Sequence, residues 1–132
     1  MDNQKIIETF RANKGIVGGP FQTMKLLLLT STGAKSGLAR TAPLAYTINN
    51  DDFVVIASKG GAPTHPDWYY NLKANPEVVV EVGEEKFNAV ATEVSGEERE
   101  KLYSAQAALY PTFNDYKSNT SREIPVFTLK KK

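Results

Sequence analysis

The plan of the chain is set by one segment, Leu26-Leu27-Leu28-Leu29-Thr30-Ser31-Thr32-Gly33-Ala34-Lys35-Ser36-Gly37-Leu38-Ala39-Arg40. It opens as an apolar strand and continues as a loop whose two glycines permit positive φ and close approach of the backbone to a ligand. Lys35 and Arg40 bring positive charge to this loop, and several Thr and Ser hydroxyls bring neutral donors. These residue types suit an anion site, but they are equally the ordinary residues of a solvated hairpin turn.

A second basic turn, Ser58-Lys59-Gly60-Gly61, follows a later apolar stretch. Antiparallel pairing of the preceding strands could bring the two turns to one rim of a sheet. The sequence therefore predicts two basic loops that either share one anion site or are separate solvated turns.

The composition limits the classes of protein and of partner. A length of 132 residues, with 41% hydrophobic and 23% charged, predicts a single globular domain over 1–132, with an N-terminal helix and linker in 1–20. The net charge of +1 gives no global field for nucleic acid, so any anion site must be local. The chain has no cysteine, which removes disulfides, thiolate metal sites and cysteine nucleophiles.

We expect a cytoplasmic protein, because the start of the sequence lacks the apolar core of a secretory signal. The longest fully apolar run, Leu26 to Leu29, is far shorter than the roughly 20 residues of a spanning helix. The N-terminal helix, with Ile6, Ile7 and Phe10 on one face, either packs on the core or touches the inner face of a membrane.

The pattern of apolar residues and turn signals predicts an α+β fold. Asp2 can cap a helix that runs to about Asn13, and further helices are expected over 66–75 and 96–109. About six strands are expected, at 25–31, 41–48, 52–58, 77–83, 86–94 and 124–129. Short turns between most of them indicate an antiparallel β-barrel or strongly curled sheet with helices outside. A GxGxxG turn is missing, which argues against a parallel nucleotide-binding sheet.

Few side chains in the sequence could carry out chemistry by themselves. His65 is the only histidine, so a histidine triad or a multi-histidine metal site lacks its parts, and no metal is expected. A chain without an evident nucleophile suggests that a cofactor carries the chemistry. Lys35, Arg40 and Lys59 would hold an anionic tail. Aromatic residues would wall a flat ring: Trp68, Tyr110, Phe113 and Tyr116.

Several motifs in a fixed order resemble the deazaflavin (coenzyme F420)-dependent nitroreductase family. They are Leu29-Thr30-Ser31-Thr32-Gly33-Ala34-Lys35-Ser36-Gly37, then Arg40 and Pro43-Leu44, Ala57-Ser58-Lys59-Gly60-Gly61, Pro66-Asp67-Trp68-Tyr69-Tyr70-Asn71-Leu72-Lys73-Ala74-Asn75-Pro76 and Tyr110-Pro111-Thr112-Phe113-Asn114-Asp115-Tyr116. The resemblance spans about 26–127. It implies a split β-barrel that binds reduced F420 and passes its hydride to a conjugated acceptor such as a quinone or a nitroaromatic compound.

The resemblance also implies roles for individual residues. Lys35, Ser36, Gly37 and Arg40 would meet the phosphate and polyglutamate side of F420. The remaining cofactor contacts would be Pro43, Ile56, Ala57, Ser58, Lys59, Trp68 and Asn71. Acceptor contacts would be Ala45, Tyr110, Phe113 and Tyr116, with Ser58 and Tyr116 orienting the acceptor by hydrogen bonds.

Two positions depart from the family's pattern, because Phe113 and Ala45 stand where the best-matched members have tyrosine. Losing two hydroxyls widens the pocket and removes donors, so activity on bicyclic nitroimidazoles does not follow from the resemblance. An FMN-binding reductase on a related split barrel is the first alternative; the surplus of basic loop residues favours F420 with its acidic tail. A non-catalytic cofactor carrier or an oligonucleotide-binding barrel is the second alternative, the latter disfavoured by the near-neutral charge. The sequence leaves the oligomeric state open.

Overall fold

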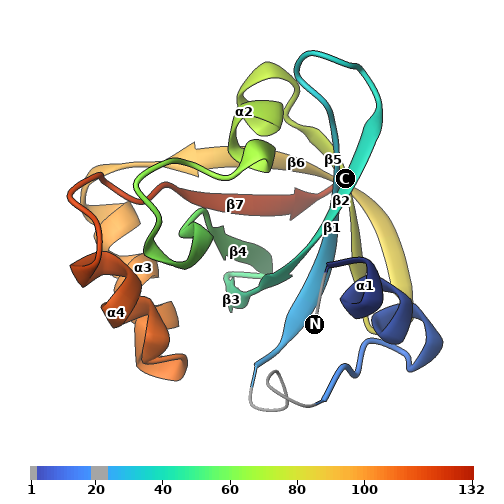
Figure 1. The fold of residues 1–132 in the computed structure, drawn as a ribbon, viewed down its shortest axis with the longest axis horizontal. Helices are drawn as coiled ribbons and strands as arrows, with labels where there is room; N and C mark the ends of the chain where they lie inside the picture. The colour runs from blue at the N-terminus through green and yellow to red at the C-terminus, as the bar shows by residue number, and fades with distance from the viewer. Residues whose placement is uncertain (1–2, 19–23) are drawn as a thin grey trace.

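The computed structural model describes residues 3–18 and 24–132, so the expected helix cap Asp2 lies outside the described residues. A curled antiparallel sheet carries helices on its outside and at one end (Figure 1). The elements are α1 (Asn3–Ala12), β1 (Leu26–Thr32), β2 (Ala39–Ala45), β3 (Thr47–Asn49), β4 (Asp52–Ile56), the 3-10 segment η2 (Lys59–Gly61), α2 (Asp67–Ala74), β5 (Glu77–Val82), β6 (Glu85–Val94), α3 (Gly96–Leu109), α4 (Thr112–Ser118) and β7 (Val126–Lys131).

The four-leucine strand β1 is buried on both faces. Because successive side chains of a strand point to opposite faces, Leu27 and Leu29 enter the core inside the curled sheet, while Leu26 and Leu28 pack against α1. β4 repeats this division, with Val55 in the inner core and its neighbours in the cluster under α3 and α4. The uninterrupted apolar runs thus reflect strands covered on both sides.

In the part of the chain that the structure describes, the sheet has seven strands in the order β2-β1-β5-β6-β7-β4-β3, one more than expected. The predicted strand 41–48 is two strands: β2 pairs with β1, and β3 pairs with β4 at the opposite edge. Tyr46 alone separates them, and its N–H bonds Lys25 O at 3.1 Å. Two edge strands joined by one residue force the sheet to curl, so the strongly curled antiparallel sheet expected from the sequence is confirmed.

The helices complete three apolar clusters. Ile6, Ile7 and Phe10 of α1 are buried against β1, as the sequence predicts. Trp68 and Leu72 of α2 close the inner core. α3 and α4 pack over β4 and the start of β7, and α4 occupies a segment for which no helix was expected.

The C-terminal lysines belong to the sheet and to its ion pairs. Lys131 ends β7 and its Nζ lies 2.8 Å from a Glu85 oxygen, while Lys132 Nζ lies 2.7 Å from a Glu77 oxygen. Both pairs are exposed, so each contributes little to stability. Among the described residues, no helix combines the length and apolar character needed to cross a membrane.

Candidate functional site

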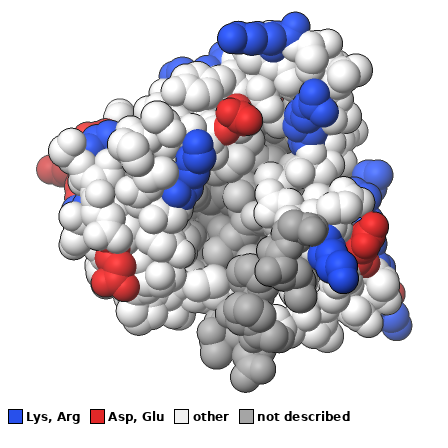
Figure 2. Space-filling view, in the orientation of Figure 1, with Lys and Arg blue, Asp and Glu red and all other residues white. Residues whose placement is uncertain are grey.

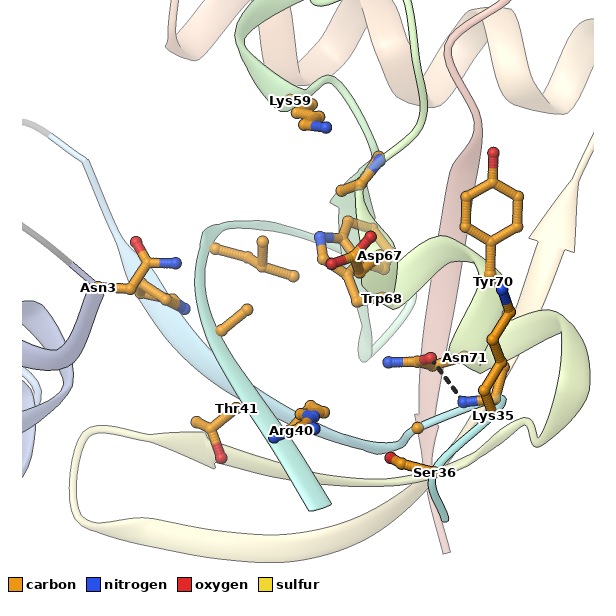
Figure 3. Close-up of a pocket in the computed structure, with 16 residues that line it drawn as sticks. Asn3, Lys35, Ser36, Arg40, Thr41, Lys59, Asp67, Trp68, Tyr70 and Asn71 are labelled. Carbon is orange, nitrogen blue, oxygen red and sulfur yellow. Dashed lines mark hydrogen bonds between the residues drawn. The ribbon is translucent and has the colours of Figure 1, made fainter. Parts of the chain in front are cut away.

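A cavity of about 1030 Å³ opens between α2, the edge strand β2 and η2 (Figure 3). Lys59 stands on one side of it, and Lys35 and Arg40 stand on the other. Its described lining is Asn3, Gly33, Ala34, Lys35, Ser36, Arg40, Thr41, Ala42, Pro43, Leu44, Lys59, Pro66, Asp67, Trp68, Tyr70 and Asn71. Residues of both basic turns therefore line one cavity, which is the arrangement that a shared anion site requires.

The β1–β2 loop forms one wall of the cavity. Gly33 N–H donates to Leu38 O at 2.8 Å and Gly37 N–H donates to Gly33 O at 2.9 Å, which closes a compact turn. Gly37 has φ of 71°, the left-handed region that favours glycine. The turn leaves the side chains of Lys35 and Ser36 exposed and at the cavity.

Asn71 on α2 holds the β1–β2 loop in place through two hydrogen bonds. This buried side chain on α2 accepts a hydrogen bond from Ala34 N–H at 2.9 Å and donates to Ser31 Oγ at 3.1 Å. Both of its polar atoms are thus used inside the protein. The sequence-predicted cofactor residue Asn71 lines the cavity and also sets the position of the loop that carries Lys35.

The opposite wall is the turn that follows β4. Lys59, Gly60 and Gly61 have φ of 48°, 64° and 81°, three successive left-handed residues. Gly61 lies so close to α4 that a Cβ there would sit 2.9 Å from Tyr116 O. The Lys59 ammonium bonds Thr64 Oγ1 at 3.3 Å in the same loop.

Arg122, for which the sequence predicts no role, ties this turn to the rest of the molecule. Its Nη2 donates to Ser58 O at 2.7 Å and to Ala57 O at 3.2 Å, and its Nε donates to Ala62 O at 2.9 Å. Its Nη1 donates to His65 Nδ1 at 3.0 Å. Burial lowers the pKa of Arg122, and guanidinium groups remain charged even so. No local pattern in the sequence marks it, because its partners lie far along the chain.

One acidic and one aromatic residue join the cations at the cavity. Asp67 and Asn71 are four residues apart on α2 and share a face of the helix, and Tyr70, three residues after Asp67, also lines the cavity. The spacing from Asp67 was the available signal for Asp67 and Tyr70, two lining residues to which the sequence assigned no role. Figure 2 shows this face of the molecule hollowed, with Lys and Arg side chains around the hollow and an acidic side chain among them.

Most of the residues expected to bind the cofactor meet at the cavity, and four do not line it. Lys35, Ser36, Arg40, Pro43, Lys59, Trp68 and Asn71 line it together. Ala57 lies in the inner core and Ile56 packs on the opposite side of the sheet toward α3. Ser58 is buried beside Lys59, and Gly37 lies in the loop away from the cavity lining.

The expected acceptor residues lie in the cluster under α3 and α4 rather than in the cavity lining. The Tyr110 hydroxyl is buried; it accepts from Lys25 N–H at 3.1 Å and donates to Tyr46 O at 3.3 Å. Phe113 is buried, and Ala45 and Tyr116 are partly buried against the same cluster. Tyr116 nevertheless reaches η2 through the close contact between its backbone and Gly61.

The cavity fits a large, planar, anionic ligand. Three cationic side chains from separate loops and strands surround it, and loop glycines admit close approach of a phosphate or carboxylate. Pro43, Leu44 and Trp68 supply an apolar wall for a flat ring. The residues present therefore match a cofactor with a ring at one end and a charged tail at the other.

The sequence model of the F420H(2)-dependent quinone reductase family matches residues 3–131. The chain belongs to this family. Membership in the F420H(2)-dependent quinone reductase family makes it an oxidoreductase whose cofactor is coenzyme F420, which confirms the resemblance and the cofactor inferred from the sequence.

Individual family members support the assignment. An F420H(2)-dependent quinone reductase of Mycobacterium tuberculosis is 42% identical over 106 residues, covering 78% of this chain and 71% of the relative. A solved F420-H2 dependent reductase (FDR-A) is 43% identical with a TM-score of 0.73, covering 80% of this chain and 93% of that one. A structure described as a domain-swapped dimer is 43% identical with a TM-score of 0.74, covering 80% and 79%. The split-barrel fold is thereby confirmed.

Proposed function

We propose that the cavity between α2, β2 and η2 holds F420 and that the chain reduces a quinone there. The observation that carries this proposal is the meeting of Lys35, Arg40 and Lys59 around one cavity. The β1–β2 loop and η2 lie far apart in sequence, and the fold places their cations on opposite sides of a single space. A polyanionic tail between them would be attracted from both walls.

Each wall has its own task in this proposal. Lys35, Ser36 and Arg40 bind the phosphate and the acidic tail, with Arg40 able to engage two oxygens at once. Lys59 closes over the tail from the other side. Pro43 and Trp68 bury one part of the ring and exclude water, with Leu44 beside them. When bound, reduced F420 supplies a hydride to two-electron acceptors.

The acceptor site is proposed to adjoin η2. Ser58 and Tyr116 belong to segments in direct contact at Gly61, so their polar groups can orient a quinone carbonyl near the cofactor. A hydrogen bond to the carbonyl stabilises the charge that develops on its oxygen. Ala45 and Phe113, which lack hydroxyls, leave this region apolar, which suits a quinone better than a nitroimidazole. Simple nitroaromatic compounds are a second acceptor class to assay.

Binding and turnover test the proposal separately. We expect F420 to bind more tightly than FMN, because FMN lacks the acidic tail. We also expect salt to weaken F420 binding, because it screens the attraction between that tail and the cationic side chains. Lys35→Ala with Arg40→Ala should weaken F420 binding at least tenfold, the equivalent of about 1.4 kcal/mol. The matched control is Lys86→Ala with Arg11→Ala, which removes the same charges away from the cavity lining. Equal affinity for FMN, or an unchanged F420 dissociation constant in the cavity variant, contradicts the site.

Turnover is followed by the absorbance of reduced F420 when menadione is added. Oxidation above the protein-free background supports the reductase. Its absence, with F420 still bound, favours a cofactor carrier. Reduction of a nitroaromatic compound in the same assay extends the acceptor class.

We place the reaction in the cytoplasm, with the acceptor taken from solution or from a nearby membrane. Ile6, Ile7 and Phe10 are buried against β1, so this face of α1 is not free to enter a bilayer. In a liposome flotation assay we therefore expect the protein in the aqueous layer. Flotation with the lipid would indicate a peripheral membrane contact.

A further inference from the structure

Arg122 lies between α4 and β7, outside every regular element and outside the lining of the cavity. Its side chain crosses to the turn after β4, more than fifty residues earlier in the chain. There it donates hydrogen bonds to three backbone carbonyls, those of Ala57, Ser58 and Ala62. These carbonyls flank the three left-handed residues of the turn on both sides.

The turn needs such a partner. β4 ends at Ile56, so Ala57 O and Ser58 O lie beyond the end of this strand. Lys59 has φ of 48°, a left-handed conformation that is unfavourable for a residue with a Cβ and persists only where surrounding contacts hold it. A planar guanidinium, with its donors in a fixed fork, can hold several carbonyls at once.

We propose that Arg122 is a positioning residue for the cofactor: by clamping the carbonyls of 57–62 it holds Lys59 over the cavity. The inference rests on the proposed function, because it gives Lys59 a partner in the acidic tail of F420. Arg122 itself is not among the described residues that line the cavity. Its effect on binding must therefore pass through Lys59 and the backbone of the turn.

This route has a consequence that a general stabilising role lacks. Removing the clamp should weaken F420 binding while Lys59 is present, and should have little further effect once Lys59 is alanine. A double-mutant cycle of F420 dissociation constants measures that coupling directly. Arg122→Lys is the principal variant, because it keeps the charge but offers a single ammonium in place of the fork.

We expect Arg122→Lys to raise the F420 dissociation constant about three- to tenfold in the natural background, and less than twofold in the Lys59→Ala background. Arg11→Ala serves as the control, since it removes an arginine that pairs with Glu81 away from the cavity lining. It should leave the dissociation constant unchanged. Equal losses in both Lys59 backgrounds, or no loss in either, overturn the inference.

Amide hydrogen exchange of the free protein supplies a second readout that does not depend on F420. The Gly61 and Ala62 N–H groups donate to Ser58 O and Lys59 O at 2.9 and 3.1 Å, so loosening the clamp should speed their exchange. Unchanged exchange in Arg122→Lys contradicts the clamp. Failure of the natural protein to bind F420 would instead refute the proposed function, and exchange would still decide whether Arg122 holds the turn. Arg122→Ala removes the whole side chain and is the more drastic variant. If it does not fold, the F420 dissociation constant and the amide exchange are measured on Arg122→Lys and Arg122→Gln.

Discussion

The side-chain oxygen of Asn71 accepts a hydrogen bond from Ala34 N–H at 2.9 Å, across 37 residues of sequence. This bond joins α2 to the tip of the β1–β2 loop, and the Asn71 amide also donates to Ser31 Oγ where β1 ends. One buried amide thus links the helix that carries Trp68 to the loop that carries Lys35. The Asn71 amide therefore fixes the position of the apolar wall of the cavity relative to the cationic wall.

We predict that Asn71→Ala lowers both stability and cofactor affinity. Removing the amide leaves Ala34 N–H and Ser31 Oγ without these partners, at a cost of about 1–3 kcal/mol in the free energy of unfolding. Urea denaturation measures that loss, and titration of F420 measures the weaker binding. Asn75→Ala is the control, because Asn75 bonds Glu77 N–H in an exposed position. An affinity equal to that of the natural protein would show that the loop keeps its place without Asn71.

Gly61→Ala should be more damaging than Gly60→Ala. Both glycines have positive φ, but a Cβ at Gly61 would lie 2.9 Å from Tyr116 O and 3.0 Å from Tyr116 Cα, whereas a Cβ at Gly60 meets no atom of the described residues within 4 Å. The shared left-handed conformation costs roughly 1–2 kcal/mol in each variant. The clash adds a further loss for Gly61→Ala, which thermal denaturation of both variants detects. Equal melting temperatures would rule out the close contact with α4.

Asp67→Asn should tighten binding of an anionic cofactor. Asp67 lines a cavity that also holds Lys35, Arg40 and Lys59, so its carboxylate repels the tail that the cations attract. The repulsion between the Asp67 carboxylate and the tail is partly screened by solvent, so its removal should lower the F420 dissociation constant about two- to fivefold at low salt. Glu97→Gln on α3 provides the control. Weaker binding of Asp67→Asn would instead assign its carboxylate a hydrogen bond to the ligand.

Tyr110→Phe separates a structural from a substrate role for this residue. Its buried hydroxyl bonds Lys25 N–H and Tyr46 O, so we expect a loss of about 1 kcal/mol in the free energy of unfolding. The KM for menadione should stay unchanged. Tyr116→Phe, in a partly exposed position, should raise that KM with little effect on stability. A raised KM in Tyr110→Phe would return Tyr110 to the acceptor site that the sequence suggested.

The free energy of unfolding should fall as the pH is lowered through the titration of His65. Burial and the adjacent Arg122 charge lower the pKa of His65 below its ordinary 6.5, and the Glu93 charge acts in the opposite direction. The stacked ring of Tyr69, at 4.2 Å, and the edge of Tyr70 complete its surroundings. The unfolded chain therefore binds a proton before the native one does, and stability present above pH 6.5 is lost toward the native pKa.

Urea denaturation between about pH 5 and 8, the range in which histidine side chains ordinarily change charge, measures this effect. His65→Gln keeps an acceptor for Arg122 without a titrating proton, so its unfolding free energy should vary less over this range. Identical pH profiles for both proteins would show that His65 is not protonated differently in the native and unfolded states.

The sequence alone was sufficient for the parts of this protein that depend on local pattern. The apolar runs of Leu26–Leu29 and of β4, the breakers around α2, and the glycines of both basic turns depend on side-chain periodicity and φ preference, which neighbours in sequence decide. The co-ordered motifs added the family and its cofactor. Local signals failed where one strand changes sheet edge at Tyr46, since nothing in 41–48 specifies two different partners.

Only the tertiary structure decided how the site is assembled. It brought Lys59 opposite Lys35 and Arg40, placed Tyr110 in a buried hydrogen bond, and set Arg122 beneath the turn after β4. These relations join residues tens of positions apart, and their free energy depends on burial and on geometry between elements rather than on local preference. A basic turn can be recognised from its own residues, but the side chain that holds it is fixed by the packing of the whole chain.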